Sequence, residues 1–130
     1  MNRLLTLSIL LVLPSLISAG EENMTLIEGT FYIDVYEYPN QRGLLPKVDV
    51  TWRQAESLCA AQGKRLCTEQ EWQKACTGLQ NFKYSYGDQL ESGRCNTPIN
   101  VDGAWQRGPG LAPSGDYERC TNDYGVHDMI

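Results

Sequence analysis

The stretch GKRLCTEQEWQKAC, residues 63–76, carries the strongest local signal in the sequence. Thr68 and Glu71 have the T-x-x-E spacing of a capping box, in which a threonine hydroxyl and a glutamate carboxylate satisfy N–H groups of the first helical turn. Trp72 begins an apolar stripe at helical spacing. The stretch therefore predicts a short helix over 68–77 with one buried tryptophan.

A second capping box lies upstream of the first. Thr51 and Gln54 have the related T-x-x-Q spacing, and Trp52 opens another apolar stripe. This pattern predicts a helix that runs to about Gln62 and ends at Gly63, because glycine readily adopts the backbone conformation that terminates a helix. We expect two short, separately capped helices packed together by small and aromatic residues.

The rest of the chain predicts strands at one end and loops at the other. Residues 24–38 alternate with period two, with an interruption at Gly29, which is typical of β-strands. Residues 97–119 are rich in glycine, proline, asparagine and aspartate, and are predicted to form loops. Together with the two helices, these segments predict a loop-rich α+β fold.

Residues 1–20 have the pattern of a secretory signal peptide. A short polar start precedes an apolar run over 4–16, and small residues at 18–20 offer a cleavage site. A membrane anchor is the alternative, but the apolar run is shorter than the ~20 residues that a spanning helix needs. We therefore expect a secreted or periplasmic protein with one domain over 21–130 and no membrane association after cleavage.

The charge balance restricts the classes of partner. The 130-residue chain has sixteen acidic and eleven basic residues, which gives a net charge of −5. Nucleic-acid-binding proteins usually present a basic face. The acidic balance therefore argues against nucleic acid as a partner, and also against docking on anionic membranes.

All five cysteines follow the predicted signal peptide, at Cys59, Cys67, Cys76, Cys95 and Cys120. In an exported chain such cysteines usually form disulfides. Zinc is the alternative, but the sequence has no C-x-x-C pair and a single histidine. Because five is odd, at least one cysteine is free or lacks its partner.

The literal residues of the helical stretches resemble the sulfatase-modifying-factor family, the formylglycine-generating-enzyme-like domains. Cys67 stands where the usual family form has proline. The segments 84–88 and 124–129 resemble further family motifs, a Tyr-Pro-Trp-Gly turn and a Tyr-Gly-Leu-Tyr-Asp-Met run. The helical residues that carry the resemblance are Thr51, Trp52, Arg65, Leu66, Thr68, Glu71 and Trp72.

The resemblance implies a loop-rich variant of the C-type lectin fold and a possible chemistry. Catalytic members hold copper(I) with two cysteine thiolates and oxidise a cysteine of a sulfatase to formylglycine. In relatives that cysteine pair lies beyond the part matched here, so we expect an N-terminal portion of the domain without catalytic residues. Cys59 and Cys76 fall where relatives have half-cystines paired to the later segment. The other three cysteines are additional, and among them we favour a Cys95–Cys120 bridge.

The resemblance also implies a calcium site that begins at Asn96. Calcium takes six to eight oxygen ligands, many of them from loops. The loop-rich half offers oxygen-bearing side chains at Asn96, Asn100, Asp102, Asp116, Asp123 and Asp128. The alternative is that these are solvated loop residues, because their spacing matches no calcium motif.

Two functions from different classes remain open. The complete protein would oxidise a sulfatase cysteine, with a sulfatase or another exported protein as its partner. Alternatively, the scaffold is a non-catalytic, lectin-like module that binds protein or glycan, since a fold does not fix a function. His127 stands where relatives have an aromatic residue and is interpreted as a packing residue.

Overall fold

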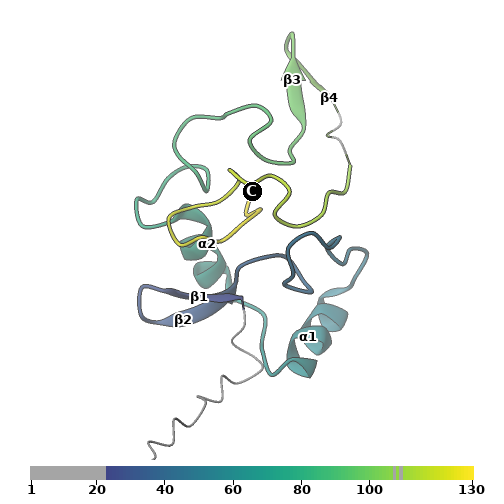
Figure 1. The fold of residues 1–130 in the computed structure, drawn as a ribbon, viewed down its shortest axis with the longest axis vertical. Coiled ribbons are helices and arrows are strands. Elements are labelled where there is room, and N and C mark those ends of the chain that lie inside the picture. The colour runs from purple at the N-terminus through teal and green to yellow at the C-terminus, as the bar shows by residue number, and fades with distance from the viewer. Residues whose placement is uncertain (1–22, 107, 109) are drawn as a thin grey trace, which may run out of the picture.

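The computed structural model describes residues 23–106, 108 and 110–130, so the predicted signal peptide lies outside it. The described part has two helices and four short strands, and the strands form two separate two-stranded sheets (Figure 1). Within that part, no helix is both long enough and apolar enough to cross a bilayer. The predicted loop-rich α+β class is confirmed.

Strands β1 (Met24–Ile27) and β2 (Phe31–Asp34) form an antiparallel hairpin in which Ile27 pairs with Phe31. Ile33 is buried and its neighbour Tyr32 is exposed, as the period-two pattern predicts. The second strand ends at Asp34, earlier than the predicted 38, and beyond it the Tyr36 N–H donates to the side-chain oxygen of Asn40 at 3.1 Å and not to a neighbouring strand.

Both capping boxes form as predicted. Helix α1 (Trp52–Ala61) follows Thr51, whose hydroxyl accepts from the Gln54 N–H at 3.3 Å. Helix α2 (Glu69–Thr77) follows Thr68, whose hydroxyl accepts from the Glu71 N–H at 3.2 Å. In each box the third residue's side chain accepts from the cap N–H in return.

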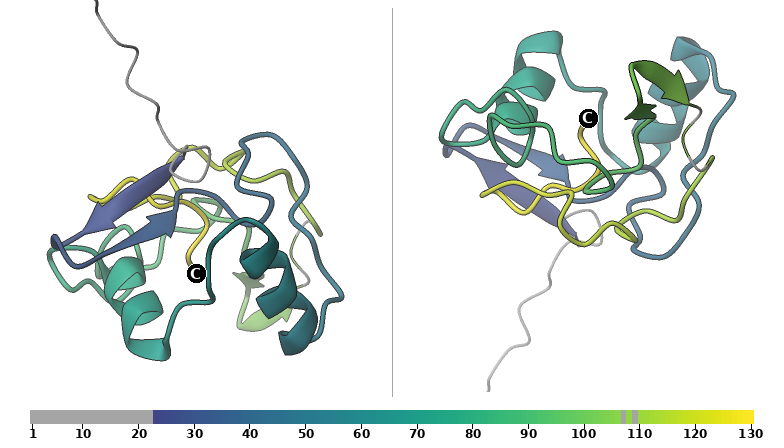
Figure 2. Two further views of the ribbon diagram at one scale, coloured as in Figure 1. Left: turned by 90° about the horizontal axis from the view of Figure 1, so that it is seen from below. Right: turned by 90° about the horizontal axis from the view of Figure 1, so that it is seen from above.

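The predicted packing of the two helices is wrong. The helices lie apart, with the C-terminus between them (Figure 2). None of the residues of α1 is buried, and Trp52 is 66% exposed. On α2 the buried residue is Ala75, whereas Trp72 is 49% exposed. The two tryptophans instead line an open groove between the helices.

The core lies between the first hairpin, α2 and the last segment of the chain, residues 120–129. Its buried members are Ile27, Ile33, Ala75, Val126 and Met129. The backbone also connects these elements, because the His127 N–H donates to the carbonyl of Val35 at 2.9 Å. The segment 120–129 therefore joins β2 to α2.

Asn122 in this segment caps the end of α2. Its amide group donates to the carbonyls of Ala75 and Cys76. Its side-chain oxygen accepts from the N–H groups of Tyr124 at 3.0 Å and Val126 at 3.3 Å. The last carbonyls of a helix have no partner within the helix, so a side chain from elsewhere in the chain supplies one.

Asp123, the next residue, binds the backbone just beyond the end of α2, beside Gly78. Its carboxylate accepts from the Leu79 N–H at 3.0 Å. Gly78 has a φ of +69°, and a Cβ there would lie 2.4 Å from the Asp123 carboxylate oxygen. A glycine is therefore needed for both the left-handed backbone and the close approach.

The prediction of loops throughout 97–119 is wrong in one place. Strands β3 (Ile99–Val101) and β4 (Ala104–Gln106) form an antiparallel hairpin that projects from one end of the protein (Figure 1). Its turn is Asp102-Gly103, with φ values of 51° and 83°. Asp-Gly favours such turns, but strands of three exposed residues show no burial alternation that could reveal them.

We expect Asn122→Ala to lower the free energy of unfolding by about 1–3 kcal/mol, because buried helix-end carbonyls lose their partner. Thermal and urea unfolding of the full chain measure this change. Asn100→Ala is the matched control, since its amide oxygen accepts from the Gly103 N–H in the exposed hairpin turn, away from any helix end. An equal loss in both variants would contradict the capping role of Asn122.

Candidate functional site

An open groove of about 770 Å³ lies between α1 and α2 and is called here the interhelix groove. His127 and the final residue, Ile130, are among the residues that line it. Its walls come from the two helices and from the segment that connects them. The wall residues that matter below are Trp52, Cys59, Arg65, Leu66, Cys67 and Trp72.

The ion pair between Arg65 and Glu71 fixes the connecting segment against the start of α2. The guanidinium of Arg65 donates to both Glu71 carboxylate oxygens, at 2.6 Å and 2.7 Å, and to the Leu66 carbonyl at 3.0 Å. Hydrogen bonds from Arg65, and then from the Thr68 backbone, lower the pKa of Glu71 to about 2. The residues that carry the family resemblance therefore hold the backbone in place.

The structure joins Cys95 and Cys120 by a disulfide, with their Cα atoms 4.9 Å apart. Both residues are buried. The bond links the irregular region after α2 to the start of segment 120–129. It therefore anchors the segment that completes the core.

The other three cysteines, Cys59, Cys67 and Cys76, are unbridged. Desolvation raises the pKa of each thiol, so all three stay protonated at neutral pH. Copper(I) binding and nucleophilic attack both require thiolates. Without a bound metal, the three thiols therefore carry little of the thiolate form.

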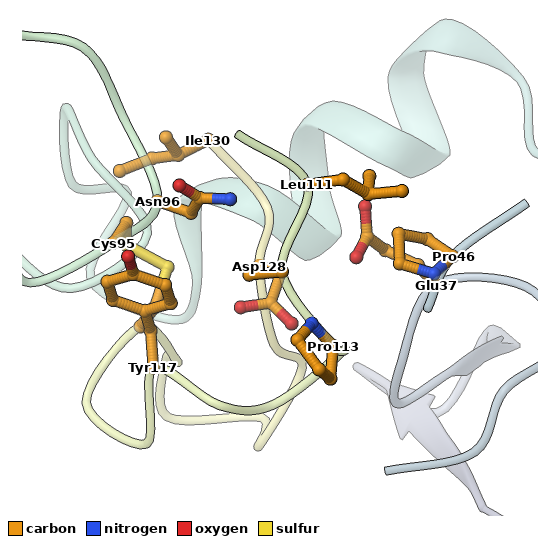
Figure 3. Close-up of a pocket in the computed structure, with 11 residues that line it drawn as sticks. Glu37, Pro46, Cys95, Asn96, Leu111, Pro113, Tyr117, Asp128 and Ile130 are labelled. Carbon is orange, nitrogen blue, oxygen red and sulfur yellow. A yellow bond between two sulfur atoms is a disulfide. The ribbon is translucent and has the colours of Figure 1, made fainter. Parts of the chain in front are cut away.

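A smaller cavity of about 140 Å³ brings together Glu37, Asn96 and Asp128 (Figure 3). The Ser114 hydroxyl donates to Glu37 at 3.2 Å, and the Gly115 N–H donates to Asp128 at 2.8 Å. Burial, and to a smaller extent the charge of Asp128, raise the pKa of Glu37. The sequence alone did not reveal Glu37, because only the fold brings the residues that follow β2 against segment 120–129.

The six expected calcium ligands are spread over several loops. Asn96 donates to the Gly110 carbonyl at 2.7 Å and lines the small cavity with Asp128. Asn100 caps the β3–β4 turn, and Asp123 holds the residue after Gly78. In the described part of the chain, no three His, Cys, Asp or Glu side chains gather closely enough to hold a metal ion.

His127 packs in the floor of the interhelix groove. Its ring stacks on Tyr36, with centroids 5.0 Å apart and planes 27° apart. Its Nδ1 atom is buried and has no hydrogen-bond partner among the described residues. The arrangement agrees with a packing role.

A family model described as "Sulfatase-modifying factor enzyme 1-like domain" matches residues 28–130. The chain belongs to this family. No solved structure matches it significantly.

Relatives with different names resemble parts of the chain. It is 33% identical over 99 residues to "Inactive C-alpha-formylglycine-generating enzyme 2" of Bos taurus, which covers 65% of this chain and 30% of the relative. It is 40% identical over 67 residues to "Formylglycine-generating enzyme" of Streptomyces coelicolor, covering 48% of this chain and 20% of the relative. The protein of the same name from Mycobacterium tuberculosis is 35% identical over 95 residues, covering 65% and 30%. The chain thus spans less than a third of the length of these relatives.

We expect the Arg65–Glu71 pair to make stability dependent on pH. Because the pKa of Glu71 is lowered from 4.5 to about 2, its ionised form stabilises the folded state above pH 4.5, and this contribution is lost as the pH falls toward 2. Glu71→Gln should therefore lower the Tm at pH 7 and have little effect near pH 2. Melting curves across this range measure the difference.

Glu69→Gln is the matched control, because it removes a carboxylate from the same helical turn and leaves the Arg65–Glu71 pair intact. Its effect on the Tm should vary less between pH 7 and pH 2. A Glu71→Gln effect that stays constant over this range would overturn the electrostatic interpretation.

Proposed function

We propose that this chain is the N-terminal scaffold portion of an exported formylglycine-generating-enzyme-like protein whose complete form oxidises a sulfatase cysteine to formylglycine. The observation that carries the scaffold assignment is the Arg65–Glu71 ion pair within a family match over residues 28–130, and the oxidising function is proposed from the relatives named formylglycine-generating enzyme. In this proposal the described residues supply the fold and the groove, and the oxidising thiols come from elsewhere in the protein.

The environment of the thiols supports this division of roles. An oxidation site needs thiolates, and neighbouring cations or helix N-termini usually supply the stabilisation. Here burial raises the pKa of Cys59 and Cys76, and desolvation followed by the charge of Glu71 raises that of Cys67. When bound, copper would supply oxygen activation, and in this proposal thiols outside the described residues would hold it.

A sulfatase is the proposed partner, because relatives named formylglycine-generating enzyme are 35–40% identical to parts of this chain. Secretion or a periplasmic location is proposed from the sequence of residues 1–20. The Cys95–Cys120 disulfide supports it, since such bonds persist mainly in oxidising compartments.

The second candidate is a non-catalytic module that binds protein or glycan. One relative of similar coverage carries the word "Inactive" in its name, so the family includes members that are not described as active. In this chain the β3–β4 hairpin presents Trp105 at 66% exposure, the kind of aromatic side chain that binding surfaces use. Conversion of a substrate peptide by a longer product of the same gene distinguishes the two candidates.

We expect the 130-residue chain alone to leave a Cys-x-Pro-x-Arg peptide unchanged when both are incubated with copper and air. Mass spectrometry of the peptide measures loss of its thiol, and the Streptomyces coelicolor relative serves as the positive control. Conversion by this chain that disappears in Cys59→Ser or Cys67→Ser would contradict a scaffold role for the described residues.

A longer product of the same gene, if one is found, is assayed in parallel. Conversion by that product supports the oxidising function. Binding of a sulfatase without conversion supports the non-catalytic module.

Calcium at Asn96 remains a prediction, supported by the oxygen atoms of Asn96, Glu37 and Asp128 around one cavity. We expect calcium to raise the Tm of the full chain, because a ligand that binds only the folded state stabilises it. Asn96→Ala should abolish the shift, and Asn100→Ala should retain it. An unchanged Tm of the original chain with calcium and with a chelator would eliminate the site.

A further inference from the structure

Residues 23–25 read Asn-Met-Thr, which is an acceptor sequence for N-linked glycosylation. Such a sequence needs a serine or threonine two positions after the asparagine and excludes proline between them, and Thr25 and Met24 satisfy both conditions. No other asparagine of the chain has serine or threonine at this spacing. The motif directly follows the predicted signal peptide, so it belongs to the part of the chain that would be exported.

The folded position of Asn23 decides whether it can carry a glycan, because so short a motif also arises by chance. A glycan is bulky and hydrophilic and therefore needs a surface position. Asn23 is exposed in the structure. The next residue, Met24, lines the interhelix groove, whereas Asn23 does not. A glycan on Asn23 is therefore accommodated at the surface without displacing a buried side chain.

The backbone of Asn23 is held in place, although its side chain is at the surface. Its carbonyl accepts from the Val35 N–H at 2.8 Å and from the Asn40 amide at 2.9 Å. Its φ is 62°, in the left-handed region that asparagine adopts more readily than most residues. The fold thus fixes the attachment point at the start of β1.

The hydrogen bonds of the motif are compatible with an attached sugar. The Asn23 amide donates to the Asn40 carbonyl at 3.4 Å. A primary amide has two N–H hydrogens, and glycosylation replaces one of them, so the other remains able to donate. The Thr25 hydroxyl donates to the Tyr124 carbonyl at 3.1 Å, a contact that the sugar leaves unchanged. The modified chain can therefore keep both contacts.

We propose that Asn23 carries an N-linked oligosaccharide in the exported protein. The co-reactant is an oligosaccharide attached to a lipid diphosphate. Nδ2 of Asn23 attacks the anomeric carbon of the first sugar, a C–N bond forms, and the bond from that carbon to the diphosphate oxygen breaks. The lipid diphosphate leaves, the amide gives up one proton to a base, and no redox change occurs. Transfer during export, before the chain folds, leaves the Thr25 hydroxyl free to take part.

Two export routes have enzymes that make this bond. The enzymes of the endoplasmic reticulum read the three-residue motif alone. Those of the bacterial periplasm also need an acidic residue two positions before the asparagine, and Glu21 stands there in the sequence. The proposal rests on the proposed export of the chain and not on its proposed oxidising function. Its test therefore has one arm for each route.

The full chain is expressed in a eukaryotic secretory host and, separately, in a bacterium whose periplasm contains such a transferase. The exported product is digested with trypsin, and mass spectrometry measures the peptide that contains Asn23 and ends at Arg42. We expect its mass to increase by one oligosaccharide in at least one arm, which identifies the class of enzyme that reads the motif. Exported chain with unmodified Asn23 in both arms would overturn the proposal.

Three variants assign the modification to the motif. Asn23→Asp suits the left-handed backbone and Thr25→Ala removes the hydroxyl, so each should lose the added mass. Thr25→Ser is the matched control, because it keeps the hydroxyl and should keep the glycan. Added mass that persists in Asn23→Asp would contradict the assignment.

Replacing residues 1–20 with an unrelated leader separates the two ways to fail. A chain that is exported only with the unrelated leader contradicts the proposed location, and the state of Asn23 is then measured in that product. A chain that is exported with Asn23 unmodified contradicts the glycan alone. Neither result depends on conversion of a sulfatase peptide.

Discussion

The contact of residues 120–129 with the β1–β2 hairpin and with α2 is the constraint on which the rest of the structure depends. Val126 and Met129 complete the buried cluster, and Asn122 caps the last carbonyls of α2. The Cys95–Cys120 disulfide fixes the start of this segment. Without this contact, neither the hairpin nor the helix would have a second apolar surface to pack against.

This constraint also explains why the two helices behave differently. Helix α2 gains a buried residue and a side-chain cap from segment 120–129, whereas no residue of α1 is buried. Helix α1 is connected to the core through the Lys64–Asp34 pair beyond its C-terminal end. Of the two helices that form the walls of the interhelix groove, α2 is thus anchored in the core, and α1 is held less firmly by the described residues.

The sequence predicted what neighbouring residues determine, and failed where distant residues decide. Both helix starts were predictable because each capping box lies within four residues. The exposure of Trp52 and Trp72 could not be predicted from the sequence, because burial depends on what packs against a helix. The Asp102-Gly103 turn was present in the sequence, but its strands are too short and exposed to show a pattern. No local sequence pattern predicts the cavity that Glu37 and Asp128 both line.

The residues that identify the family are distinct from residues that could perform its chemistry. Arg65, Thr68 and Glu71 satisfy one another and set the path of the backbone into α2. That task is the same in an oxidising enzyme and in a binding module, so these residues would match relatives of either kind. The names of the relatives agree, since one is called inactive and others are called enzymes. Similarity at these residues therefore identifies the fold of the chain. The activity has to be argued from other residues, namely cysteines whose surroundings favour the thiolate form.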